Sequence, residues 1–97
     1  MRRVVLAPDA VEQLRRLTAR DRSILRAAMR EQLGEADATT ETRNRLRLRR
    51  PSIMAEFELR VQDMRVFYRV VGDEVQVVII GRKRGSMLIV AGKRFIL

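Results

Sequence analysis

Residues 55–81 alternate between apolar and polar side chains with the period of two that a half-buried strand requires. The pattern predicts three consecutive strands joined by tight turns at residues 62–63 and 72–73. The second turn is Gly-Asp, and its glycine supplies the positive φ that a two-residue hairpin loop needs. The third strand, residues 75–80, is apolar on both faces except for Gln76, as expected in the middle of a sheet. We therefore expect an antiparallel meander.

Pairing the first hairpin across residues 62–63 places Arg60 opposite Arg65 and Glu58 opposite Phe67. One face of the two strands is then apolar and must be covered: Phe57, Leu59, Val61, Val66, Tyr68 and Val70. The other face is charged, with one ring in it: Glu56, Glu58, Arg60, Arg65, Phe67 and Arg69. Two directly opposed arginines are unfavourable unless an anion binds near them. The charged face is either a solvated surface with cross-strand ion pairs or a binding or catalytic platform.

The first third of the chain predicts a strand followed by two amphipathic helices. Residues 2–6 are β-branched and short, and Pro8 with Asp9 favours a helix start directly after them. A break at residues 18–21 separates this helix from a second, over about residues 22–33, which we expect Gly34 to end. Each helix carries one apolar stripe. Joined by so short a break, the helices should form an antiparallel hairpin that covers one face of the sheet.

An arginine-rich segment, residues 43–50, contains five arginines in eight positions. As an extended strand, it would direct one set of side chains to one side: Arg43, Arg45, Arg47 and Arg49. The two leucines would point to the other side. Such a segment is either an edge strand with a solvated basic face or an anion-binding surface. Like charges at this density repel each other unless an anion is near, which favours the second interpretation.

Residues 81–86, GRKRGS, predict a second basic element, a turn after the last central strand. Its two glycines would let the backbone approach a partner, and consecutive N–H groups in such a turn can bind an anion. Residues 87–90 predict a further short strand. A loop at residues 91–94 and a strand or extended tail would complete the chain. The fold class is thus α+β, in the order β-α-α-β-β-β with a short C-terminal strand or tail.

Composition narrows the function. The 97 residues, enough for one domain spanning 1–97, include 21 Lys+Arg against 12 Asp+Glu, a net charge of +9. For a small domain this basic we expect a polyanionic partner, usually a nucleic acid, or an acidic protein partner. Without cysteine or histidine, disulfides, thiolate metal sites and the commonest general base are excluded. We expect no metal, no cofactor and no membrane span or signal peptide, and therefore a cytoplasmic protein.

Residues 58–68, ELRVQDMRVFY, resemble a hairpin of the RelE/ParE toxins of bacterial type II toxin–antitoxin systems, whose pattern is ELRVGDYRVFY. Residues 80–84 match the glycine and basic residues with which that family leaves its last central strand. Residues 41–51 resemble a run common in one branch of the family. The similarity covers most of the chain and is concentrated in residues 41–85.

The resemblance implies a small α+β toxin that an acidic antitoxin holds inactive. RelE-like members bind the ribosome and cleave mRNA, through attack of a 2′-hydroxyl on the neighbouring phosphate, and so inhibit translation. ParE-like members instead inhibit DNA gyrase. By the resemblance, Arg65 is the phosphate-stabilising arginine and Lys83 belongs to the cationic site after the last strand. The residues that would bind RNA are Arg43, Arg45, Arg47, Arg49, Arg60, Arg69, Arg82 and Arg84.

The sequence departs from the RelE pattern at two places. Glu56 and Glu58 stand where the first meander strand of RelE supplies lysines, and Ile89 or an apolar neighbour stands near the family's C-terminal tyrosine position. The remaining candidates for a general base are Glu56, Glu58, Tyr68 and Lys83. A glutamate facing an arginine forms either a base–electrophile pair or a plain ion pair. Three functions stay open: an endoribonuclease, a non-enzymatic gyrase inhibitor, and a degenerate toxin that only binds its antitoxin.

Overall fold

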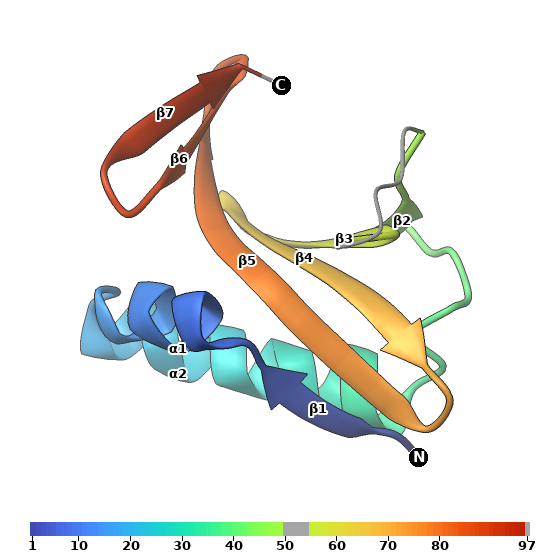
Figure 1. Ribbon diagram of the computed structural model, residues 1–97. Helices are drawn as coiled ribbons and strands as arrows, with labels where there is room; N and C mark the ends of the chain where they lie inside the picture. Colours follow the sequence, from blue (N-terminus) through green and yellow to red (C-terminus); the bar gives the residue numbers. More distant parts are fainter. Residues whose placement is uncertain (50–54, 97) are drawn as a thin grey trace.

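The computed structural model describes residues 1–49 and 55–96, and it has the α+β architecture expected from the sequence, with two helices packed on an open, largely antiparallel sheet (Figure 1). The helical elements are α1 (Pro8–Arg15), α2 (Ala19–Met29) and a π-helical continuation of α2, η1 (Arg30–Glu35). The strands are β1 (Arg3–Leu6), β2 (Arg45–Arg47), β3 (Phe57–Val61), β4 (Met64–Val71), β5 (Glu74–Arg84), β6 (Met87–Val90) and β7 (Lys93–Ile96).

The strand order is β2-β3-β4-β5-β6-β7, and β1 pairs in parallel with the first residues of β5. β5 therefore has β4 on one edge, and β1 followed by β6 on the other. Between β1 and β6, this edge of β5 receives a hydrogen-bond acceptor from α1. The Oε1 of Gln13 accepts the N–H of Ile80 at 2.6 Å. The sequence pattern indicated β1 but not its parallel pairing with a strand some 70 residues away.

The predicted register of the β3–β4 hairpin is confirmed, with Arg60 opposite Arg65 and Glu58 opposite Phe67. The predicted turn at residues 81–86 is wrong in its extent. β5 continues through residues 81–84, because β4 and then β6 supply hydrogen-bonding partners there, and only residues 85–86 turn. The predicted loop at 91–94 is also shorter: Ala91 and Gly92, with φ of 51° and 82°, turn the chain directly into β7.

The second helix differs from prediction at both ends. It begins at Ala19, because the Oγ1 of Thr18 accepts the N–H of Asp21 at 3.1 Å and caps the helix. It does not stop at Gly34, since η1 continues to Glu35. The carbonyl of Gly34 accepts the N–H of Arg2 at 3.0 Å, which ties η1 to the residue that precedes β1. No helix of the described residues is both long and apolar enough to cross a membrane.

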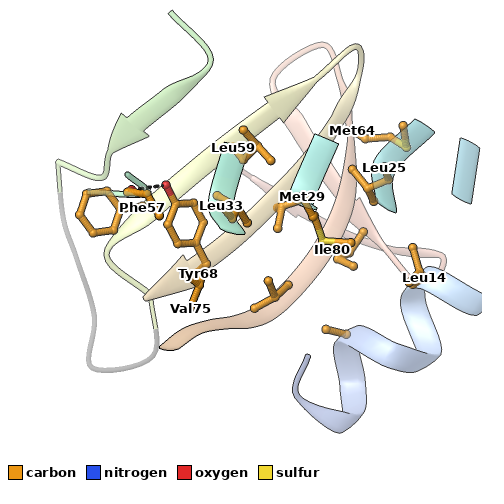
Figure 2. Close-up of a cluster of buried hydrophobic side chains, with 14 residues drawn as sticks. Leu14, Leu25, Met29, Leu33, Phe57, Leu59, Met64, Tyr68, Val75 and Ile80 are labelled. Atoms are coloured by element: carbon orange, nitrogen blue, oxygen red, sulfur yellow. Dashed lines mark hydrogen bonds between the residues drawn. The ribbon is translucent and has the colours of Figure 1, made fainter. Parts of the chain in front are cut away.

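The core lies between the helices and one face of the sheet (Figure 2). Leu25, Met29 and Leu33 of the second helix and η1 are buried with the inward residues of β3, β4 and β5. The rings of Phe57 and Tyr68 stack at a centroid distance of 5.3 Å. Each large side chain buried in this way contributes about 1.5–3 kcal/mol to folding. Because the helices cover this face, the charged face of the meander is the outer face of the sheet.

Candidate nucleic-acid interface

Two cations from different strands lie on the outer face, near the β3–β4 turn. Arg65 of β4 is directly opposite Gly81 of β5, and Lys83 follows Gly81 by two residues on the same side of the strand. Diagonal neighbours of this kind are about 7–8 Å apart. The N–H of Lys83 donates to the carbonyl of Asp63 at 2.7 Å, which ties this end of β5 to the turn. The sheet thus brings together two predicted site residues.

The charge of Arg65 is positioned but not neutralised. Its Nη1 donates to the carbonyl oxygens of Gln62 and Met64, both at 2.9 Å. Gln62 has a φ of 57°, which belongs to the tight turn that presents its carbonyl. Within the described part of the chain, neither Arg65 nor the exposed Lys83 forms an ion pair with a carboxylate. Both cations can therefore bind an external anion without first losing an internal one.

The two predicted carboxylates differ in their surroundings. Glu58 is on the outer face, two positions along the sheet from Arg65, and its Oε1 accepts a 2.7 Å hydrogen bond from Nε of Arg60. Its side chain is 13% exposed. Glu56 precedes β3 and lies at the other end of the hairpin, where its Oε1 is 3.4 Å from the N–H of Val70. Of the two, only Glu58 is close along the sheet to the cations.

The hypothesis that Tyr68 acts as a general base is corrected by its position in the fold. It belongs to the core face of β4, is fully buried, and donates its hydroxyl hydrogen to the carbonyl of Ala38 at 2.7 Å (Figure 2). Burial raises the pKa of Tyr68 to about 12, while the charge of Arg45 acts in the opposite direction. A buried phenol with this pKa cannot accept a proton from a substrate on the far side of the sheet.

The prediction that Arg82 binds RNA is also corrected, because the charge of Arg82 is neutralised inside the protein. It shares the helix side of the sheet with Met64, which it faces across the strand pair. Its guanidinium binds Asp21 of α2 at 2.7 Å and both carboxylate oxygens of Asp63 at 2.8 Å. The hydrogen bonds that Arg82 donates to Asp21 first, and then to Asp63, raise the pKa of Arg82 above its ordinary value. Arg82 fastens the β3–β4 turn to the helix layer.

The prediction for the arginine-rich segment, residues 43–50, is corrected in two respects. Of its described residues, only Arg45–Arg47 form a strand. Arg45 and Arg47 pair with core residues of β3, so both lie on the helix side of the sheet, where Arg45 is buried and Arg47 is exposed. Arg45 is 6% exposed, and its Nε and Nη1 donate to the carbonyls of Thr40 at 3.1 Å and Gln32 at 2.8 Å. The guanidinium of Arg47 lies 4.6 Å from the ring centroid of Phe57. Residue 50 lies outside the described residues.

The other predicted RNA-binding arginines are distributed around the sheet. Arg60 is paired with Glu58, and Nε of Arg69 donates to Oε1 of Gln76 at 2.6 Å on the outer face. Arg84 is exposed, but it follows Arg82 by two residues in β5 and therefore lies on the same side of the strand as Arg82. Two further arginines, Arg43 and Arg49, are exposed outside β2. The outer-face set is therefore smaller than predicted and is centred on Arg65 and Lys83.

Gly81 lies beside the site, and its role differs from the predicted one of a turn glycine that lets the backbone approach a partner. A Cβ there would lie 2.8 Å from Cγ2 of Val90 and 3.0 Å from both Cδ1 of Leu88 and the carbonyl of Ile89. The missing side chain lets β6 pack against β5 directly beside Arg65. A glycine inside a strand pattern is the sequence signal for such a close approach.

No group of three or more acidic, histidine or cysteine side chains that could hold a metal ion occurs in residues 1–49 and 55–96. What the geometry offers is cationic: one arginine fixed by carbonyls, one exposed lysine, and a carboxylate–arginine pair nearby. This arrangement can bind a phosphate group and stabilise negative charge that develops on it. A comparison with protein-family models finds none that matches the chain, and a comparison with curated proteins finds no match.

Proposed function

We propose that this protein is a RelE-like toxin that cleaves mRNA on the ribosome and is held inactive by an acidic antitoxin. The observation that carries the proposal is the outer face, where Arg65 and Lys83 are brought together without a neutralising carboxylate among residues 1–49 and 55–96. The order of elements supports it too, since a strand and a two-helix hairpin precede an antiparallel meander, as the resemblance to the RelE/ParE toxins implies.

In the proposed reaction, a ribose 2′-oxygen attacks the neighbouring phosphorus and the bond to the 5′-oxygen breaks. Arg65 binds the non-bridging phosphate oxygens, whose negative charge grows in the transition state. Glu58 accepts the proton of the 2′-hydroxyl, and Lys83 donates a proton to the departing 5′-oxygen. Glu58 must exchange its hydrogen bond from Arg60 to take this role.

The decisive experiment is inducible expression of the wild type, Arg65→Ala and Arg20→Ala, followed by primer extension on abundant mRNAs. We expect the wild type to cut within translated codons and Arg65→Ala to lose activity by about 100-fold, the usual cost of removing one donor to a developing charge. Arg20 is an exposed arginine of α2, so its variant is the matched control. Equal cleavage by all three proteins would contradict the assignment of Arg65.

A second candidate function, inhibition of DNA gyrase without catalysis, is favoured by the Glu58–Arg60 ion pair. If that pair is permanent, the outer face has no base and serves only for binding. Growth arrest with intact messages and with DNA damage would support this function and exclude the ribonuclease. Normal growth on expression without an antitoxin would instead support a degenerate toxin.

A further inference from the structure

The ring of Phe67 lies on the outer face of the sheet, the face turned away from α1 and α2 (Figure 1). Its neighbours along β4, Val66 and Tyr68, are fully buried in the core, so the alternation of the strand directs Phe67 outward. The ring is half-buried, and it is not one of the described side chains that form the core or pack against it. The packing of the helices on the sheet therefore does not account for an aromatic residue at this position.

The surface beside the ring is apolar toward β5 and β6. Ile79 is directly opposite Phe67 in β5, and Gly81 is the next residue of β5 on the outer face. The space above Gly81 is filled from β6, because a Cβ at Gly81 would lie 3.0 Å from Cδ1 of Leu88 and 2.8 Å from Cγ2 of Val90. An apolar strip of three aliphatic side chains therefore adjoins the ring.

On its other sides, the ring borders the charged groups of the proposed site. Arg65 precedes Phe67 by two residues on the same face of β4, which is about 6–7 Å along the strand. Glu58 is directly opposite Phe67 in β3. The distance between the ring and the guanidinium-bearing position is comparable with the span from phosphate to base within one nucleotide. A ligand that carries a phosphate and a flat apolar ring in neighbouring positions fits this arrangement.

The ring of Phe67 lacks a π partner inside the protein. Within residues 1–49 and 55–96, no other ring stacks on Phe67 and no guanidinium lies over it. The core ring of Phe57 differs in both respects, since Tyr68 stacks on it at 5.3 Å and the guanidinium of Arg47 lies 4.6 Å from its centroid. An aromatic residue without such partners, on a sheet face that also carries cations, is the arrangement on which proteins stack the bases of single-stranded RNA.

We propose that Phe67 is a nucleobase-stacking residue. A base of the bound RNA lies flat on its ring, while Arg65 and Lys83 bind the phosphate of the same or the adjoining nucleotide. The inference rests on the proposed function in one respect, the binding of RNA phosphates at these two cations, and it does not require cleavage. Because a phenyl ring offers a stacking surface and no hydrogen-bonding groups, the site accepts any base.

The test compares two single-stranded oligonucleotides that lack the attacking 2′-hydroxyl, an oligodeoxyadenylate and the same deoxyribose-phosphate chain without bases. By fluorescence anisotropy, the wild type should bind the first about tenfold more tightly, the share of one stacked base. Phe67→Ala should bind both alike, whereas Phe67→Trp should keep the preference. Val71→Ala is the matched control, because Val71 is an exposed apolar residue of the same face of β4 that lies away from Arg65, and it should also keep the preference.

A base analogue reports the stacking directly. The fluorescence of 2-aminopurine falls when it stacks on an aromatic ring, so an oligonucleotide with this base and otherwise without bases should be quenched by the wild type. Phe67→Leu, which keeps an apolar side chain but removes the ring, should abolish the quenching. Quenching that persists in Phe67→Leu would overturn the assignment of the ring.

The outcomes separate this inference from the proposed function. Intact messages together with a base preference that depends on Phe67 would contradict the ribonuclease and support the stacking residue. Cleavage within codons together with equal binding of the two oligonucleotides would do the reverse. No binding of either oligonucleotide would overturn both the stacking residue and the phosphate site.

Two further results would overturn the stacking residue alone. Equal losses of affinity for both oligonucleotides in Phe67→Ala would mean that the ring only supports the fold, and thermal unfolding of each variant measures that effect. A dimer in sedimentation velocity that Phe67→Ala dissociates would mean that a second copy of the chain covers the ring.

Discussion

The arginine-rich segment and the outer face around Arg65 use positive charge in different ways. In the segment, Arg45 is buried against backbone carbonyls and Arg47 stacks on Phe57, so the fold itself uses both side chains. On the outer face, Arg65 and Lys83 remain without a carboxylate partner among the described residues. The density of cations along a sequence is therefore a poor measure of the charge that a folded protein offers to a ligand.

The physical reason lies in what each arginine meets after folding. The strand β2 pairs with β3 so that Arg45 points into the space between the sheet and the end of η1. Backbone carbonyls near a helix end lack partners within the helix and require donors. The guanidinium of Arg45 supplies a donor to the carbonyl of Gln32 in η1, and a second donor to the carbonyl of Thr40 in the loop that follows η1. Arg65 meets carbonyls too, but beside the β3–β4 turn, and its side chain is only half-buried.

The largest effect that would test this comparison is on stability. Arg45→Met should lower the free energy of unfolding by about 3–5 kcal/mol, because it removes two hydrogen bonds that a buried, charged guanidinium donates to backbone carbonyls. Arg43→Met, at an exposed position two residues earlier, should change it by less than about 0.5 kcal/mol. Urea unfolding of both variants measures the difference. Similar values for the two would show that Arg45 is not part of the fold.

The next effect is a loss of stability at alkaline pH. The pKa of Tyr68 is raised to about 12 in the folded state, so its contribution is complete below pH 10 and is lost as the pH rises toward 12. The loss is about 2–3 kcal/mol at the upper end. Since Tyr68 is the chain's only tyrosine and tryptophan is absent, tyrosinate absorbance follows its titration directly.

Tyr68→Phe is the control for this experiment, because it should remove the alkaline loss that belongs to the phenol. Arg45→Met tests the electrostatic contact between Arg45 and Tyr68 in the same titration. The charge of Arg45 lowers the pKa of Tyr68, so its removal should move the tyrosinate transition to still higher pH. A transition near pH 10 in the wild type would contradict the burial of this ring.

A smaller effect concerns RNA binding by the outer face. Lys83→Ala should reduce the salt dependence of single-stranded RNA binding by roughly 0.7 in log K per log salt, the share of one phosphate contact. Arg82→Ala should leave the slope nearly unchanged, because Asp21 and Asp63 already neutralise that arginine. Anisotropy titrations at several salt concentrations measure both slopes. Equal changes for the two variants would mean that the ion pairs of Arg82 open in the complex.

The smallest expected effect is at Arg47. Its guanidinium stacks on a ring that is itself 3% exposed, and such a contact stabilises a partly exposed site by about 0.5–1 kcal/mol. Arg47→Gln should cost that amount in thermal unfolding and leave mRNA cleavage unchanged. Arg47→Lys, which keeps a cation but loses the planar stacking surface, separates charge from contact. A marked loss of RNA binding in Arg47→Gln would return this arginine to the interface.

Local patterns predicted the elements of the fold because their period is a local property. The alternation around residues 57–71 gave the register of the β3–β4 hairpin correctly, down to Arg60 opposite Arg65. The apolar stripes of the first third likewise indicated two helices over one face of a sheet. Errors occurred at element ends, such as residues 81–84, where the neighbouring strands β4 and β6 decide whether the backbone continues as a strand.

The sequence by itself determined the α+β class, the meander and the excess of positive charge. Only the tertiary structure decided which cations remain available, since Arg45, Arg65 and Arg82 look alike in sequence and differ only in the groups they meet. It also decided the parallel pairing of β1 with β5 and the direct approach of β6 at Gly81. These features depend on contacts between residues far apart along the chain, and no local period carries information about them.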